Sequence, residues 1–516
     1  MSLLSPTADL LLYGGRVLTL DPTYPIAAAV AVSAGKILAV DGESELRPFL
    51  SPHTQTLPCN GRTILPGFID PHLHLFAWAS RFRGADLSAA RSIPEIEHLL
   101  ARRLPRISAA EWVRGSGYDE FFLAEKRHPT RYELDTVSGD HPIILRHRTG
   151  HAAVLNSAAL RRAGIDQYFV PPGGGSVERD PHTGEPTGVV YELEQFLRTV
   201  VPPLSAHDFT AAVRQAGAEL LRQGVTSFHD ASAGNSLADF MLFRRFSADG
   251  ILRSRATVMV GSAALPQVLE AGLVPFSGDE RVRLGSVKIM VHESRGTLYP
   301  EPDVLAEMVW QAHQHGFQAA LHAVEEGAVC AALDAIAQAQ VRLPRTDHRH
   351  RIEHCALCPP PFIEKLVETG TVVVTQPGFL HFYGEKYAAE VDPEVHDWLY
   401  RTKSLLDQGV PVVGSSDCPI APLSPLIGVQ AALTRRSRTG IPLNLRERLT
   451  LLEALTLFTR AGAWVGFEER RKGRIMPGML ADLVVLDRDL TAVPAEAINT
   501  LKVVTTIIGG EVVWSA

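Results

Sequence analysis

Amphipathic helices and short apolar strands alternate through the middle of the chain, and this alternation limits the fold more than any other feature. Four helix–strand units show it most clearly, at residues 205–228, 302–322, 360–376 and 401–417. In each unit a glycine stands where a helix commonly ends in a left-handed residue, namely Gly224, Gly316, Gly370 and Gly409. Short apolar strands between amphipathic helices indicate a parallel sheet with helices on its faces.

The number of strands predicts an α/β protein built on a (β/α)8, or TIM, barrel. Candidate strands begin near Ile64, Pro142, Val225, Arg255, Ser286, Phe317, His350, Thr371 and Pro411. This is one strand more than an eight-stranded barrel holds, so we assign the extra strand to an insertion at about residues 78–204. The barrel with its insertion then spans residues 63–465.

Both ends of the chain have β-rich patterns with glycine turns, and neither end has enough strands to bury a core alone. We therefore expect residues 1–62 and 466–516 to pair into one small composite β-sandwich domain.

The composition excludes several classes of protein. Apolar residues make up 46% of the 516 residues and charged residues 21%, which excludes an intrinsically disordered chain. A formal net charge of −7 argues against a nucleic-acid partner, and no apolar stretch approaches the roughly 18 residues of a membrane span. The first residues do not have the pattern of a signal peptide, and the five cysteines do not make a disulfide framework. We expect a cytoplasmic enzyme that binds neither nucleic acid nor a membrane.

Polar side chains end the predicted barrel strands. His72 and His74 lie two apart in an extended segment, so both imidazoles face the same way and can reach one ion. Later strands end in Lys288, His322, His354, Gln376 and Asp417. The carboxyl ends of barrel strands converge at one mouth, where active sites lie. Isolated histidines are more often core or surface residues, but four at equivalent strand ends, with an aspartate, predict a Zn²⁺-type metal site.

Lys288 lies inside an apolar strand, between Val287 and Ile289. If its ammonium faced a divalent cation at about 4 Å, the repulsion would be about 8 kcal/mol at an effective dielectric constant of about 20. A carbamate, formed from the amine and CO₂, would instead be an anionic ligand that bridges two ions. A neutral lysine, or one that extends to solvent, also avoids the repulsion.

The sequence resembles the amidohydrolase superfamily, and within it the amidohydrolase-3 branch that includes N-substituted formamide deformylases. The segments that carry this resemblance run over nearly the whole chain: GFIDPHLHL, HRTGHAAVLNSAAL, DPHTGEPTGVVYE, QGVTSFHDA, SVKIM, ALHAV, RIEHC, TQPGFL, GSSDCPIAPLSPLIGVQAALTR and GRIMPGMLADLVVLDRD. The resemblance implies a distorted barrel with a composite β domain and, at the family level, a homodimer. It is specific for the branch and not for a substrate.

The resemblance also implies a ligand set. His72 and His74 would bind the more buried metal, and His322 and His354 the more exposed one. Carboxylated Lys288 would bridge the two ions, and Asp417 would bind metal and shuttle a proton. The chain departs from the family after the lysine strand, where His292 and Glu293 replace an Asp-Gly pair. These two residues either belong to the rim of the mouth or alter the site.

Several further residues are candidates for contacts with the substrate. Arg148 and His151 lie in the insertion, and His151 either touches the substrate oxyanion or packs beside the helix that Asn156 caps. Trp78, Gln376 and Phe379 follow strand ends and would line a pocket, although aromatic residues pack in loops more often. Cys355 and Cys358 have the spacing of a redox or zinc pair, but we expect both to be small buried residues.

These features predict a metal-dependent amidohydrolase that cleaves a C–N bond, in an amide or formamide of a small molecule, through a metal-activated hydroxide. One or two Zn²⁺ ions, or other divalent ions, and CO₂ as the Lys288 carbamate would be its cofactors. Asp417 would transfer the proton, and His322 or His151 would hold the oxyanion. The alternatives are a deaminase or cyclic amidohydrolase with the same barrel site, which Lys288 disfavours, and a catalytically silent metal-binding regulator.

Overall fold

A computed structural model describes residues 7–106, 108, 111–172, 175–294 and 296–516 of the protein. The chain forms two compact units. The first comprises the described part of Met1–His74 with Gly217–Cys418 and Pro422–Ala516, and the second comprises Leu75–Ala216 with Pro419–Ala421. We call the second one the insertion unit. Among the described residues, no helix combines the length and the apolar character needed to cross a membrane.

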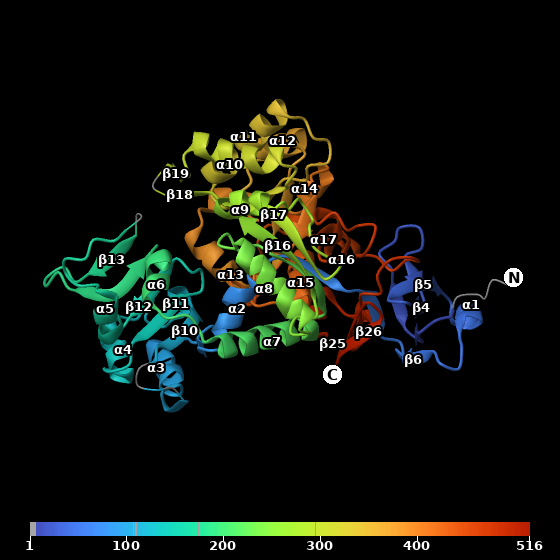
Figure 1. The fold of residues 1–516 in the computed structure, drawn as a ribbon, viewed down its shortest axis with the longest axis horizontal. Helices are drawn as coiled ribbons and strands as arrows, with labels where there is room; N and C mark the ends of the chain where they lie inside the picture. Colours follow the sequence, from blue (N-terminus) through green and yellow to red (C-terminus); the bar gives the residue numbers. More distant parts are fainter. Residues whose placement is uncertain (1–6, 107, 109–110, 173–174, 295) are drawn as a thin grey trace. The chain divides into compact units, whose positions relative to one another are not determined.

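Eight parallel strands form the central sheet of the first unit (Figure 1). They are, in spatial order, β8 (Phe68–Leu73), β15 (Val225–Asp230), β16 (Arg255–Gly261), β17 (Val282–Met290), β20 (Ala319–Ala323), β21 (Arg351–His354), β22 (Val372–Thr375) and β23 (Val412–Gly414). The first and last strands approach each other through backbone hydrogen bonds: the Asp417 amide donates to the His72 carbonyl (2.8 Å), and the His74 amide donates to the Cys418 carbonyl (2.7 Å). The sheet is thus nearly closed into a barrel, which confirms the predicted fold class.

The helices between these strands follow the predicted pattern. They include α7 (Ala206–Arg222), α8 (Leu237–Ala248), α10 (Pro302–Gln314), α11 (Glu326–Arg342), α12 (Pro360–Thr369) and α14 (Lys403–Asp407), and α15 (Pro425–Thr434) follows the last strand. The four glycines predicted to end helices all have positive φ, and Gly370 is the left-handed residue directly after α12. Each of these glycines thus provides the left-handed residue that ends a helix before the next strand begins.

The first barrel strand begins later than its sequence pattern suggests. The apolar run that starts near Ile64 is divided at Gly67 into β7 (Thr63–Pro66), which joins a different sheet, and β8. A Cβ atom at position 67 would lie 2.2 Å from Oγ1 of Thr226, so the chain can pass here only without a side chain. One apolar run therefore serves two sheets, which its hydrophobicity alone does not reveal.

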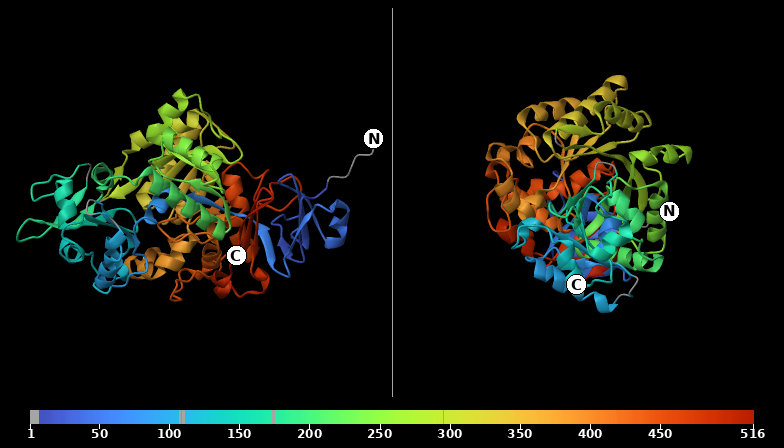
Figure 2. Two further views of the ribbon diagram at one scale, coloured as in Figure 1. Left: turned by 60° about the horizontal axis from the view of Figure 1, so that its bottom comes forward. Right: turned by 90° about the vertical axis from the view of Figure 1, so that its left-hand side faces the viewer.

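Strands near the N-terminus form one further sheet of the first unit, and they share a second sheet with strands near the C-terminus. One sheet has the order β5 (Lys36–Asp41), β4 (Ala29–Ser33), β1 (Leu10–Tyr13), β6 (Gln55–Pro58). The other has the order β26 (Glu511–Ser515), β25 (Val503–Ile508), β24 (Leu483–Leu486), β7, β2 (Arg16–Leu18), β3 (Ile26–Ala27). Figure 2 shows the N-terminal strands in blue beside the C-terminal strands in red, and β7 pairs antiparallel with β24. Leu12, Ile64 and Leu483 are buried in their common core.

The insertion unit is built on a six-stranded mixed sheet. Its order is β13 (Ser176–Arg179), β14 (Pro186–Tyr191), β12 (Ala152–Leu155), β11 (Ile143–His147), β10 (Val113–Tyr118), β9 (Ala85–Asp86). The ninth predicted strand, near Pro142, is β11 and thus lies outside the barrel. Helices α2 (Leu75–Arg81), α3 (Ile93–Ala101), α4 (Arg131–Val137), α5 (Ser157–Ala163) and α6 (Glu194–Val200) complete this unit. The side chain of Asn156 accepts the amide of Ala159 at 2.9 Å, so Asn156 caps α5 as predicted.

Candidate metal centre

Three ligand atoms converge where the barrel closes. Oδ1 of Asp417 lies 3.4 Å from Nε2 of His72 and 3.1 Å from Nε2 of His74. Ligands bound at about 2.0–2.1 Å to a tetrahedral zinc ion lie about 3.3 Å from one another, so these atoms have the spacing of a ligand set. Burial, with the positive charge of Lys288, lowers the pKa of His72 to about 3, which keeps the imidazole neutral as a ligand must be.

The second nitrogen of three of the histidines has its own partner. Nδ1 of His72 lies 2.5 Å from Oε2 of Glu353, Nδ1 of His74 lies 3.1 Å from Oγ of Ser232, and Nδ1 of His354 lies 2.8 Å from Oε1 of Gln376. When Nδ1 donates a hydrogen bond, Nε2 is left with a lone pair for a metal, and the ring is held in one orientation. The protein thus prepares each ring for coordination through Nε2.

Glu353 belongs to a buried charged pair. Arg351 binds both carboxylate oxygens of Glu353, with Nη2 donating to Oε2 at 2.8 Å, and Nη2 also donates to the Pro71 carbonyl at 2.9 Å. Burial would raise the pKa of Glu353, but Arg351 and His72 outweigh it and hold the pKa well below its usual value. The carboxylate is therefore charged when it accepts the hydrogen bond from His72.

Lys288 has the environment that its sequence context suggested. Its side chain is buried, and Nζ makes no hydrogen bond with any described residue. Burial lowers the pKa of Lys288 from 10.5 to about 8, although Glu353 and Asp417 favour the charged form. An unpartnered buried amine is costly, and an amine that loses its proton near neutral pH can react with CO₂. The residue therefore fits the predicted carbamate.

His322 and His354 lie beside these ligands. Their ring centroids are 4.6 Å apart, and the rings of His354 and His72 are 5.1 Å apart. His354 (φ 75°) and Asp417 (φ 56°) both have left-handed backbone conformations, which are strained for residues other than glycine. Such strain is common at functional sites, where the surrounding structure over-determines the backbone. The structure thus brings together the four histidines and the aspartate of the predicted ligand set.

The predicted substrate residues of the barrel are buried. Gln376 is fully buried. Its side-chain NH₂ donates to Oγ of Ser415 (3.0 Å) and its oxygen contacts Nδ1 of His354, so both ends of the amide have partners inside the protein. Phe379 lies in α13 (Pro377–Glu390), where its ring packs against Tyr383 and Tyr400. A contact of either residue with substrate stays a prediction.

The other candidates lie in the insertion unit. Trp78 lies in α2 and packs against Phe82, and Arg148 binds the carboxylate of Asp119. The side chain of His151 is 62% exposed, and its Nδ1 lies 2.9 Å from Glu192. The roles of these three residues in catalysis or substrate binding stay predictions.

The residues that departed from the family pattern form a short strand, β18 (His292–Ser294). The carboxylate of Glu293 lies against the first turn of α11, since a Cβ atom on Gly327 would lie 2.2 Å from its Oε2. Cys355 and Cys358 are free and buried, as expected.

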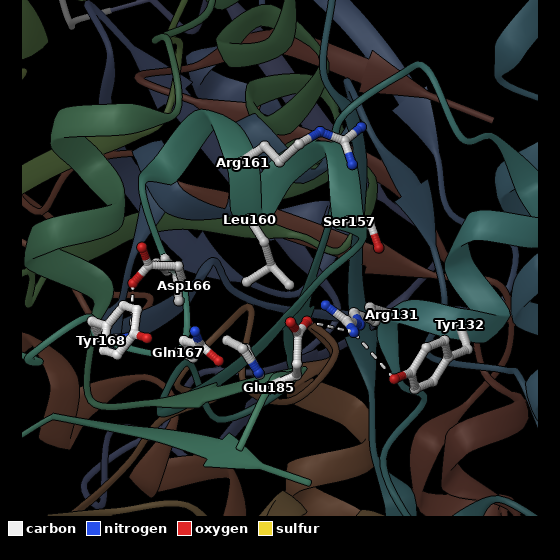
Figure 3. Close-up of a pocket in the computed structure, with 11 residues that line it drawn as sticks. Arg131, Tyr132, Ser157, Leu160, Arg161, Asp166, Gln167, Tyr168 and Glu185 are labelled. Carbon is white, nitrogen blue, oxygen red and sulfur yellow. Dashed lines mark hydrogen bonds and ion pairs between the residues drawn. The ribbon is translucent and has the colours of Figure 1, made fainter. Parts of the chain in front are cut away.

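A surface pocket of about 410 Å³ lies in the insertion unit, between α4, α5 and the loop before β14 (Figure 3). Its main charged groups pair with each other, because Nη2 of Arg131 donates to Oε2 of Glu185 (3.0 Å) and to the Tyr132 hydroxyl (3.1 Å). None of its lining residues is a predicted site residue. The barrel ligands therefore remain the candidate centre.

Sequence reasoning missed Glu353, Arg351 and Ser232. The first two lie in β21, whose sequence RIEH has a single apolar residue, so its polarity gave no sign that the whole strand is buried. Ser232 had no signal either, because a serine after a strand is an ordinary loop residue.

The chain is similar to known proteins along most of its length. The model of the amidohydrolase family matches residues 55–514. The chain is 29% identical to the N-substituted formamide deformylase of Arthrobacter pascens, over 97% of each chain. It is 28% identical to the YtcJ protein of Bacillus subtilis (strain 168), over 97% of this chain and 98% of the relative. The crystal structure of an uncharacterized metal-dependent hydrolase from Pyrococcus horikoshii OT3 superposes with a TM-score of 0.75 at 24% identity, over 94% of this chain and 99% of that chain.

Proposed function

The chain belongs to the amidohydrolase family, and from this premise we propose that it hydrolyses a C–N bond in an amide or formamide of a small molecule. The observation that carries the proposal is the convergence of His72, His74 and Asp417. The buried amine of Lys288, which belongs to the same predicted ligand set, has no hydrogen-bond partner among the described residues. The similarity to a formamide deformylase over nearly the full length of both chains supports this choice of bond.

Zinc is the proposed cofactor. His72, His74 and Asp417 would hold one ion, and His322 and His354, with Lys288 as a carbamate, would extend the site to a second ion. Bound zinc lowers the pKa of a water molecule to about 7 and polarises a carbonyl oxygen. Carbamate formation joins the Lys288 nitrogen to CO₂. The ammonium first loses one proton, and the resulting amine loses a second as the N–C bond forms, so a cationic side chain becomes an anionic one.

Asp417 is the proposed proton carrier. Its carboxylate is ionised, because His72 and His74 outweigh the effect of burial and hold its pKa well below the usual range. It accepts the proton of the attacking water at a carboxylate oxygen and then donates that proton to the leaving nitrogen, as a general base and then a general acid. His322 or His151 would donate a hydrogen bond to the developing oxyanion.

A substrate panel tests the proposal. The protein is purified without chelator and assayed on formamides, N-acyl amines, cyclic ureas and amino-substituted heterocycles, with and without chelator treatment. We expect turnover of a formamide or an N-acyl amine that is lost on chelation and returns with Zn²⁺ and bicarbonate. Release of ammonia from the heterocycles alone would contradict the proposal and favour a deaminase, and absence of turnover on the zinc-loaded protein would favour a silent regulator.

A further inference from the structure

A second group of ligand-type side chains lies in the insertion unit, at the ends of two parallel strands. Asp119 follows β10, and His147 is the last residue of β11. The two strands are neighbours in the sheet, with Tyr118 opposite His147, so their carboxyl ends bring Asp119 and His147 to one edge. Glu120 follows directly and begins a short 3₁₀ helix, Glu120–Phe122.

The distances in this cluster suit a single ion. Nε2 of His147 lies 2.9 Å from Oε2 of Glu120 and 3.8 Å from Oδ1 of Asp119. These separations lie on either side of the approximately 3.3 Å between ligands of a tetrahedral zinc ion. All three ligand atoms lie within 4.8 Å of one another. Asp119 and His147 are each only 6% exposed, whereas the Glu120 side chain is 27% exposed and leaves a path for an ion to enter.

The orientation of His147 also suits a ligand. Its Nε2 lies 2.9 Å from Oε2 of Glu120, but this contact does not have the angles of a hydrogen bond. In the part of the chain that the structure describes, Nε2 therefore has no hydrogen-bond partner. Its Nδ1 lies 2.8 Å from Oγ1 of Thr149 and accepts the Thr149 amide at 3.4 Å. Nε2 is therefore the ring nitrogen that faces the two carboxylates, where a shared cation could replace its proton.

The two oxygens of Asp119 have different partners. Oδ2 binds Nε of Arg148, whereas Oδ1 accepts the amide of Phe121 at 3.0 Å and lies 3.8 Å from Nε2 of His147. Arg148 thus offsets part of the negative charge at Oδ2, and Oδ1 is the oxygen of Asp119 that faces His147.

We propose that Asp119, Glu120 and His147 bind a divalent cation, with Zn²⁺ as the preferred class because one imidazole and two carboxylates form its ligand set. This ion would be additional to those of the barrel centre. It would join the end of β11 to the loop after β10 and so brace the insertion unit. The competing arrangement is an imidazolium of His147 held between the two carboxylates without any metal.

Zinc binding to the full-length protein separates the two arrangements. Three chelator-treated proteins are titrated with Zn²⁺: the wild type, Glu120→Gln and the control Glu194→Gln. The control removes an exposed carboxylate that pairs with Arg146 in the same unit. We expect Glu120→Gln to hold one equivalent fewer than the wild type and the control, and the zinc affinity of that site to fall at least tenfold. A His74→Asn variant of the barrel centre should keep the insertion site, so loss at one centre is distinguishable from loss at the other.

A measurement on the wild type covers the case in which a variant fails to fold. Crystals of the wild-type protein grown with Zn²⁺ should show anomalous scattering at the zinc edge between Asp119, Glu120 and His147. Equal zinc content in the wild type and Glu120→Gln, or crystals without that peak, would overturn the proposal in favour of the imidazolium.

Discussion

Oε2 of Glu353 lies 2.5 Å from Nδ1 of His72, and both side chains are almost completely buried. The contact links a candidate metal ligand to a carboxylate whose two oxygens both accept hydrogen bonds from Arg351. A buried carboxylate in this position sets the tautomer of the imidazole and raises its basicity toward a metal.

We predict that Glu353→Gln lowers the affinity of the barrel centre for zinc by about 10- to 100-fold. It should also destabilise the fold by about 3–5 kcal/mol, because Arg351 keeps a buried charge without its partner. Competition with a chromogenic chelator measures the first effect, and urea unfolding measures the second. Glu368→Gln, on the exposed face of α12, is the control and should change neither. Wild-type zinc affinity in Glu353→Gln would refute the orienting role.

Lys288 should make zinc loading depend on CO₂. If the side chain is a carbamate, chelator-treated protein given Zn²⁺ in CO₂-free buffer should recover little activity, and bicarbonate should restore it. Carbon-13 NMR with labelled bicarbonate should then show one carbamate signal per chain, which Lys288→Met lacks. Full recovery without bicarbonate would show that Lys288 acts as an amine.

Asp417→Asn should remove most of the turnover and leave the fold intact, because the amide keeps the shape of the side chain but cannot accept the proton. We expect a loss of about 10²- to 10⁴-fold in kcat, the usual contribution of a positioned acid–base group. Steady-state kinetics on the substrate that the panel identifies provides the measurement, and circular dichroism checks the fold. Asp407→Asn, an exposed aspartate paired with Lys403, is the control. Wild-type kcat in Asp417→Asn would exclude the proton-carrier role.

A chain of buried histidines should make the protein sensitive to acid. Nε2 of His350 lies 2.7 Å from Nδ1 of His313, and Nδ1 of His350 accepts the amide of Ala319 at 2.9 Å. Nδ1 of His348 accepts the amide of His350, also at 2.9 Å, so the backbone satisfies these nitrogens only when the rings are neutral. Burial lowers the pKa of His348 to about 4 and that of His350 well below its usual value.

The sign of the pH effect follows from these shifts. A histidine of the unfolded chain takes up a proton near pH 6.5, whereas folded His348 does so only near pH 4. Its contribution to stability is therefore complete above about pH 6.5 and falls as the pH drops toward 4. His348 alone should cost about 2 kcal/mol between pH 7.5 and pH 5. Urea unfolding at both pH values measures the loss, which should shrink in His348→Asn but not in His207→Asn, an exposed control. An equal loss in both variants would exclude the effect.

The barrel and the convergence of the candidate ligands could be predicted because parallel strands end at one mouth, so the residue that ends each strand carries positional information. His72, His74 and Asp417 were brought together in this way. Glu353 could not be placed, because its role depends on which neighbour it meets across the barrel interior. The break between β7 and β8 at Gly67 could not be predicted either. Position 67 must be glycine because Thr226 packs against it, and the sequence does not show that contact.

The backbone hydrogen bond from Asp417 to His72 joins the last barrel strand to the first, at the same place where the ligand atoms meet. His74 and Asp417 are 343 residues apart in the chain, so this seam is a strongly non-local contact. Contacts of that span are slow to form, because the chain must close a very long loop before they can add stability. A chain that is truncated or misfolded before its last barrel strand docks therefore lacks part of the candidate donor set and, under the proposed function, would be inactive.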